Sequence, residues 1–144
     1  MEIRRSHVSD AAAIAELELN IFSHPFTERD IANYISSENG MCFTALENGE
    51  VIAYVVGNKI FSDGEIYRFA VREDKRKCGI GLELLRFAMR AEKECGITEV
   101  FLEVREQNAA ARALYLSYGF EEIGRRENYY LDPKDNAILM AIRL

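Results

Sequence analysis

The sequence predicts an α/β (α+β) fold in which about four helices flank one mixed, mostly antiparallel sheet. Apolar residues follow strand and helix periods along the chain, an Asn-Gly pair separates two β-rich runs, and one helical segment separates two strand-like runs. Strands joined through one helix lie parallel, whereas strands joined by tight turns lie antiparallel. We therefore expect a sheet of about six to seven strands with one central parallel pair.

The composition is that of an ordinary soluble domain. The chain has 144 residues, of which 49% are apolar and 29% charged, and it contains no internal repeat or linker. This length can bury one sizeable core, so we expect residues 1–144 to form a single domain. The N-terminal residues lack an apolar signal region, and no run approaches the roughly 18 to 20 apolar residues of a membrane span. We expect a cytoplasmic protein with no membrane partner.

The first predicted helix covers residues 9–22, where Ser9 or Asp10 can cap the first turn. Its apolar side chains recur at helical spacing, namely Ile14, Leu17 and Ile21. This pattern is typical of a helix with one buried face.

The second predicted helix begins with a capping box. Thr27 is the N-cap, Asp30 follows three residues later, and Phe26 is placed to pack against Ile31 as a hydrophobic staple. The helix is expected to end near Gly40.

Three antiparallel strands should follow. Two β-rich runs, 41–46 and 51–61, flank the segment ENGE with its Asn-Gly pair, which is a strong hairpin signal. Residues 63–71 are expected to form the third strand, after an Asp-Gly turn.

The second half of the chain alternates helices and strands. Residues 79–95 have the helical period, and Gly96 lies where a C-terminal left-handed residue belongs. The remaining elements are a strand at 97–104, a helix from Asn108 to Gly119, and two strands joined by the turn LDPKDN. The helix at 79–95 should join two parallel strands.

Charge and cysteine content exclude several functional classes. The formal net charge is −6, which argues against general nucleic-acid binding and favours a basic partner. The three cysteines are widely spaced with no CxxC pair, so neither a metal site nor a disulfide framework is expected.

The loop RKCGIG precedes the helix at 79–95. Gly79 and Gly81 would let an anion approach the free N–H groups of a helix N-terminus. Four basic residues crowd this stretch and reverse the local charge, namely Arg72, Lys75, Arg76 and Lys77. The sequence thus predicts a site for a phosphorylated ligand.

Several interpretations of this loop remain open at this point. A Walker loop is absent, and a Rossmann fingerprint lacks its third glycine, where Leu84 stands, although Glu103 lies at the distance of a ribose-binding acid. The glycines could also serve a tight turn alone. Cys78 at a helix N-terminus could be a reactive thiol, although no His–acid partner is identified.

Two later residues could perform acid–base chemistry. Strand alternation places the Glu103 carboxylate on one face of a central strand, where it needs solvent, a partner or a cleft. Tyr115 lies at helical spacing from Ala111, and its hydroxyl could protonate a leaving group. Equally, Glu103 could lie on a solvated sheet face, and Tyr115 could be a core aromatic.

The order of elements and the loop RKCGIG resemble the GNAT family of N-acetyltransferases, in which Arg76, Gly79 and Gly81 match the R/Q-x-x-G-x-G signature. The resemblance implies that acetyl-CoA is the co-substrate and that no metal is needed. It implies cofactor contacts from the strand end Phe69, Ala70 and Val71, from Arg76, Lys77, Cys78, Gly79, Ile80, Gly81 and Leu82, and from Asn108.

Within that family, the segments LEVR, NxxA, LYxxxGF and RxNYY are similar to RimI-type enzymes. This similarity implies acetylation of the N-terminal alanine of the eighteenth small-subunit ribosomal protein, with other N-termini, lysine or a small amine as alternatives. It implies that Glu103 is the general base and Tyr115 the general acid, and that Tyr129 and Tyr130 hold the peptide. A monomer or weak dimer is expected.

One residue departs from the RimI-type pattern. Phe26 occupies the position of a tryptophan in the element that shapes the acceptor groove. The prediction that acetyl-CoA is the donor therefore does not depend on Phe26, whereas the prediction of the acceptor does.

Overall fold

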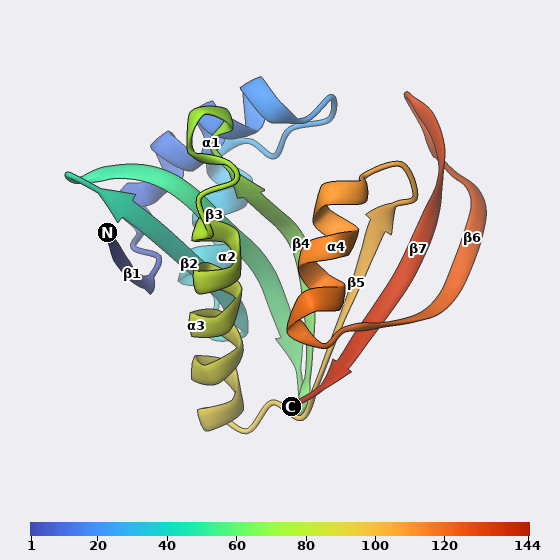
Figure 1. Ribbon diagram of the computed structural model, residues 1–144. Helices are drawn as coiled ribbons and strands as arrows, with labels where there is room; N and C mark the ends of the chain where they lie inside the picture. The colour runs from blue at the N-terminus through green and yellow to red at the C-terminus, as the bar shows by residue number, and fades with distance from the viewer.

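The computed structural model describes all residues from 1 to 144 and contains one seven-stranded sheet in the order β1-β2-β3-β4-β5-β7-β6 (Figure 1). The strands are β1 (Glu2–Arg5), β2 (Gly40–Glu47), β3 (Glu50–Ile60), β4 (Asp63–Val71), β5 (Glu99–Arg105), β6 (Glu121–Leu131) and β7 (Lys134–Arg143). All neighbouring strands are antiparallel except β4 and β5, which are parallel. The predicted mixed sheet with one parallel pair is confirmed.

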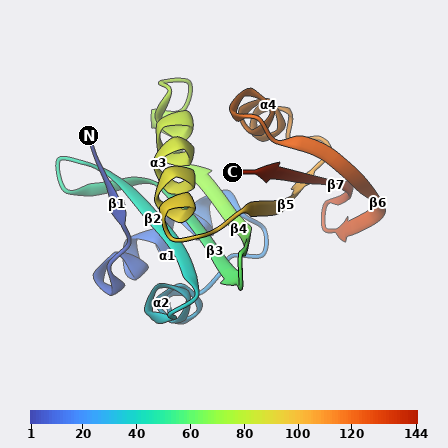
Figure 2. The same ribbon diagram turned by 90° about the horizontal axis from the view of Figure 1, so that it is seen from below.

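Four α-helices cover the two faces of the sheet, as expected. They are α1 (Ala11–Ile21), α2 (Glu28–Ser36), α3 (Ile80–Glu94) and α4 (Ala109–Tyr118), with short 3-10 turns η1 (Val8–Asp10) and η2 (Glu73–Lys75). Figure 2 shows α3 and α4 on one face of the sheet and α1 and α2 on the other. Each face therefore has its own buried apolar cluster. None of these helices combines the length and the apolarity that crossing a membrane requires.

The N-terminal helices confirm the predicted capping box but not the first cap. The Asp30 N–H donates to Thr27 Oγ1 at 3.1 Å, and the Thr27 N–H donates to the Asp30 carboxylate at 3.0 Å. By contrast, the Asp10 carboxylate accepts from Arg4 at 2.7 Å and makes no hydrogen bond to α1. Helix α2 ends at Ser36, earlier than expected, because Gly40 already begins β2.

The first hairpin forms at the predicted turn. The turn of the second hairpin lies two residues earlier in the chain than predicted. Asn48 and Gly49 have φ values of 52° and 79°, as a turn with two left-handed residues requires. The β3–β4 turn is made by Phe61 and Ser62, while Asp63 already pairs with Ile60. The expected Asp-Gly turn is therefore wrong.

Strand β1 was not expected from the sequence. It is an edge strand of only four residues, and it pairs antiparallel with β2. Its sequence is mostly charged, so neither apolar alternation nor a bounding turn distinguishes it from a disordered start.

Strands β4 and β5 separate toward their C-terminal ends, and this separation determines where a site can form. Their pairing runs only from Asp63 opposite Glu99 to Ile66 opposite Leu102. Beyond this point the two strands diverge, as Figure 1 shows. A bulge at Tyr67 interrupts the β3–β4 ladder at the same level. Backbone groups at the end of β4 are consequently left without a strand partner.

Candidate active site

The loop before α3 presents unpaired backbone N–H groups. Gly79 is the N-cap with a φ of 80°, a left-handed conformation that glycine adopts without strain. The first N–H that bonds within the helix is that of Glu83, which donates to the Gly79 carbonyl at 3.2 Å. The N–H groups of Ile80, Gly81 and Leu82 therefore have no carbonyl partner in the helix, and they lie at its positive end.

Three elements meet closely at Gly81. A Cβ at this position would lie 3.3 Å from Cδ2 of Leu114 and 3.6 Å from side-chain carbons of Phe69 and Val71. The start of α3, the end of β4 and helix α4 thus approach one another here. The glycine loop and the strand end of Phe69 and Val71 therefore lie side by side.

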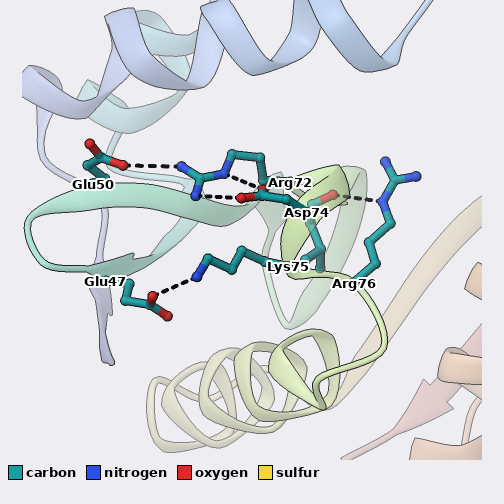
Figure 3. Close-up of polar contacts among 7 residues, drawn as sticks. Glu47, Glu50, Arg72, Asp74, Lys75 and Arg76 are labelled. Carbon is teal, nitrogen blue, oxygen red and sulfur yellow. Dashed lines mark hydrogen bonds and ion pairs between the residues drawn. The ribbon is translucent and has the colours of Figure 1, made fainter.

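The basic residues of the loop divide into two groups (Figure 3). Arg72 bonds to Asp74 at 2.6 Å and lies 3.3 Å from Glu50, and Lys75 lies 2.7 Å from Glu47. These two cations are neutralised by neighbouring carboxylates, so the expected reversal of local charge rests on fewer residues than the sequence suggested. The other two basic residues, Arg76 and Lys77, have no carboxylate partner within 4.0 Å.

The Val71 N–H faces the gap between β4 and β5. The Arg72 N–H donates to the Ile52 carbonyl oxygen at 2.8 Å, and N–H directions alternate along an antiparallel strand. The Val71 N–H therefore points away from β3. The Val71 carbonyl points the same way, since it accepts from Nε of Arg76 at 3.0 Å. Since β5 has diverged here, this N–H is available to a ligand.

These features fit a phosphorylated cofactor with an extended arm. The free N–H groups and the unpaired cations Arg76 and Lys77 could hold phosphates, and the open edge of β4 at Phe69 and Val71 could hold the arm. Cys78 is exposed, and its Sγ donates to the Arg76 carbonyl at 3.4 Å. The Ala70 side chain faces the opposite cluster, beneath α1 and α2.

Tyr115 is buried beside the end of β4. Its ring packs edge-on against Phe69 at a centroid distance of 5.9 Å and lies 5.5 Å from Phe120. Burial raises the pKa of Tyr115, with a smaller contribution from Tyr130, so its hydroxyl stays protonated at neutral pH. Asn108 Oδ1 accepts from the Ala111 N–H at 3.2 Å, which confirms the predicted N-cap of α4.

Glu103 lies on the opposite face of the sheet, as strand alternation predicted. Val100, Leu102 and Val104 are buried under α3 and α4, whereas the Glu103 carboxylate lies 3.7 Å from Nε of Arg126. It borders a groove of about 350 Å³, here called the Glu103 groove. The groove is lined by parts of β3–β7, including Asn58, Ile60, Glu65, Tyr67, Ile123 and Leu139.

Tyr129 and Tyr130 both lie near Glu103. Interaction with the Glu103 carboxylate raises the pKa of Tyr129, and burial followed by the Glu103 charge raises the pKa of Tyr130. Neighbouring strand residues normally face opposite ways. Here the β6–β7 register shifts between Arg126 and Tyr130, and Asn128 has a φ of 53°. This irregularity brings both tyrosines to one side. The only sequence signal for this irregularity was Asn128, because asparagine tolerates the left-handed region.

Phe26 lies against the guanidinium of Arg68 in β4. The Arg68 guanidinium is 4.2 Å from the centre of the Phe26 ring and 3.0 Å from the carboxylate of Glu18. Glu18 is fully buried and also accepts from the Tyr54 hydroxyl. Sequence analysis missed this network, because its members come from three separate elements.

Glu65 is a further residue that sequence analysis missed. Alternation along β4 places it on the face of Glu103, and both carboxylates border the Glu103 groove. Burial, followed by the Glu103 charge, raises the pKa of Glu65. Glu65 and Tyr67 are two residues apart, a spacing that places both side chains on one face of a strand. Both side chains line this groove, so their spacing was a usable sequence signal.

The chain belongs to the acetyltransferase (GNAT) family, whose model matches residues 11–120. It is an acetyl-CoA-dependent N-acetyltransferase.

Among its relatives is the ribosomal protein bS18-alanine N-acetyltransferase of Escherichia coli, 32% identical over 136 residues that cover 93% of this chain and 91% of the relative. An N-alpha-acetyltransferase of Sulfurisphaera tokodaii is 30% identical, with 99% and 92% of the chains covered.

Solved structures agree with the family assignment. The crystal structure of the ribosomal-protein-S18-alanine N-acetyltransferase from Escherichia coli has a TM-score of 0.90 at 30% identity and covers 99% of this chain and 92% of that one. Ard1 from Thermoplasma volcanium has a TM-score of 0.90 at 26% identity, with 99% and 97% covered.

Proposed function

We propose that the protein acetylates the N-terminal α-amine of a ribosomal protein, with alanine as the acceptor residue, in the cytoplasm. The observation that carries this proposal is the position of Glu103, between two tyrosines and an arginine on the face opposite the α3 glycine loop. The names of the bacterial relatives support the same acceptor. We further propose that residues 1–144 act as one domain, as a monomer or weak dimer.

Acetyl-CoA supplies the acetyl group as a thioester. In our proposal the N–H groups of Ile80, Gly81 and Leu82, with the side chains of Arg76 and Lys77, hold its pyrophosphate. The Gly79 backbone, which has no Cβ, leaves room for this approach. Further contacts to the cofactor come from the Cys78 backbone, Asn108, Phe69 and Ala70.

Glu103 and Tyr115 take different acid–base roles because they lie on opposite faces of the sheet. Glu103 takes a proton from the acceptor ammonium, directly or through one water, and leaves the neutral amine that can attack. The Val71 N–H donates to the acetyl carbonyl as negative charge develops there. Tyr115 holds the proton that the departing thiolate accepts as the carbon–sulfur bond breaks. Phe26, Tyr129 and Tyr130 bind the peptide beside the amine.

An α-amine suits this site better than a lysine does. Its pKa is about 7.7 to 8.0, against about 10.4 for lysine, so one carboxylate suffices to neutralise it near neutral pH. The net charge of −6 also suits a basic ribosomal segment.

A peptide panel tests the acceptor. Initial rates are measured by mass spectrometry for one peptide that begins Ala-Arg-Tyr, for matched peptides that begin with Met or Ser, and for a blocked peptide that carries one lysine. We expect the alanine peptide to react fastest. Preferred acetylation of the lysine, or of none of these peptides, would reject the proposed acceptor but leave the family assignment intact.

A further inference from the structure

Arg68 on β4 anchors the segment between α1 and α2. Its Nε lies 3.0 Å from Oε1 of Glu18, and its terminal nitrogen donates to the His24 carbonyl at 2.7 Å. The same Glu18 oxygen accepts from the Phe26 N–H at 2.9 Å. Because a fully buried carboxylate requires partners of this kind, the segment is fixed to β4 through one charge network.

The bulge in β4 gives Arg68 this position. Ile66 and Phe69 belong to the cluster under α3 and α4, whereas the Tyr67 ring lies 5.5 Å from that of Tyr34 in α2. Regular alternation would turn Arg68 toward the face of Ile66. One extra residue instead turns both Tyr67 and Arg68 toward α1 and α2.

Arg105 on β5 anchors the β6–β7 turn in a similar way. Its two terminal nitrogens donate to the Pro133 carbonyl at 2.7 Å and to the Asp132 carbonyl at 3.3 Å. Its guanidinium also lies 4.2 Å from the centre of the Tyr130 ring. A planar guanidinium can stack and donate in two directions at once, which a lysine ammonium cannot.

The two anchored segments touch each other. Ser23 Oγ donates to the Asp132 carbonyl at 3.1 Å, and Nε2 of His24 lies 4.0 Å from the Asp132 carboxylate. Arg105 follows Glu103 by two residues on the same face of β5, and the charges of Glu103, Arg105 and Arg68 all act on the pKa of Tyr130, so the joined segments lie on the Glu103 face of the sheet.

We infer that Arg68 and Arg105 are a pair of positioning residues for the acceptor amine: Arg68 fixes Phe26, and Arg105 fixes Tyr130. This inference rests on the proposed function, in which both rings contact the acceptor. The arginines act through the rings and the backbone of their two segments, while the donor loop lies on the other face. Their loss should therefore weaken acceptor binding and leave donor binding unchanged.

Steady-state kinetics of Arg68→Lys and Arg105→Lys test the inference. With the Ala-Arg-Tyr peptide we expect the acceptor KM to rise about tenfold, since small displacements of positioning groups have effects of this size. The KM for acetyl-CoA should stay at the wild-type value. Arg4→Lys is the matched control, because Arg4 is 23% exposed against 22% for Arg68 and also binds a carboxylate.

Amide hydrogen exchange supplies a readout that needs no acceptor. In both variants, residues 22–27 and 131–134 should exchange faster, while the amides of α3 keep their protection. The Arg68→Lys variant can lose its fold if Glu18 is left without its arginine partner. In that case the Arg105→Lys variant decides the test, because Arg105 bonds only to exposed carbonyls and its loss leaves no buried charge.

Unchanged exchange in these segments, an unchanged acceptor KM, or equal increases in both KM values would overturn the positioning role. A wild-type enzyme that acetylates no peptide N-terminus would instead overturn the proposed function, and the exchange data would still report on the two arginines.

Discussion

Glu103 and Tyr115 lie on opposite faces of the sheet, close to where β4 and β5 separate. Glu103 faces Arg126 and the tyrosine pair, while Tyr115 packs against Phe69 under α3 and α4. In the proposed mechanism one group therefore receives a proton on the acceptor side while the other holds a proton on the donor side. Each role can be tested by removing a single functional group.

Replacing Glu103 with glutamine should slow transfer and spare cofactor binding. The amide keeps the size of the side chain but cannot take a proton, so kcat should fall by about 10²- to 10⁴-fold. Calorimetric titration with acetyl-CoA should give wild-type affinity. Glu99→Gln, four residues earlier on the same face of β5, should keep wild-type kcat. A Glu103→Gln enzyme with the wild-type rate would exclude this residue as the base.

Replacing Tyr115 with phenylalanine should also lower kcat at an unchanged affinity for acetyl-CoA. The substitution keeps the ring contacts with Phe69 and Phe120 and removes only the hydroxyl. Tyr118→Phe, one turn later on α4, is the control. If the two variants have equal rates at neutral pH, the acid is another group.

The proposed role of the α3 loop in binding acetyl-CoA can be tested through two glycines with matched backbones. Gly79 has a φ of 80° and Gly49 a φ of 79°, and a Cβ would meet no atom within 4 Å at either position. Alanine should cost each variant about 1–2 kcal/mol of folding free energy. Only Gly79→Ala should weaken acetyl-CoA binding in calorimetry, because its Cβ enters the space beside the free N–H groups. Equal acetyl-CoA affinities would argue against a phosphate site there.

Most elements marked by adjacent residues could be predicted, whereas the edge strand β1 and the bulge in β4 could not. The Thr27 capping box and the Asn48-Gly49 turn depend on adjacent residues, and both form as expected. Strand β1 depends on an edge supplied by β2, and the bulge at Tyr67 depends on the β3 register. Two helices separate β2 from β1, and the bulge lies opposite Val56 and Gly57, ten or eleven residues before it, so local pattern carries little information about either feature.

For the whole molecule, buried phenols predict a loss of stability at high pH. Burial raises the pKa values of Tyr54 and Tyr115 in the folded state. Above pH about 10 the unfolded chain loses these protons while the folded chain retains them. The free energy of unfolding should therefore fall as pH rises, by up to about 1.4 kcal/mol per pH unit for each phenol.

Denaturant unfolding between pH 8 and 11 measures this loss. Tyr115→Phe should show a shallower decline than the wild type, and Tyr118→Phe a wild-type decline. A Tyr115→Phe protein with the wild-type slope would show that this phenol does not contribute.

Site residues could be predicted from the sequence where a single helix or strand determines their position. Helix start and strand alternation sufficed to place Gly81 at the free N-terminus of α3 and Glu103 on the face of the Glu103 groove. The Glu18–Arg68 network joins α1 to β4, and the bulge reverses the direction that alternation assigns to Arg68. The shape of the acceptor side therefore follows from the assembled sheet, whereas the donor loop is largely local.

One measurement tests the central claim most directly, namely that the chain acetylates a protein N-terminal α-amine. The enzyme is incubated with acetyl-CoA and a single peptide that begins Ala-Arg-Tyr and also contains an internal lysine, and the acetylated position is located by fragment-ion mass spectrometry. We predict a single acetyl group on the alanine nitrogen and none on the lysine. Acetylation of the lysine with the α-amine left free would contradict the account.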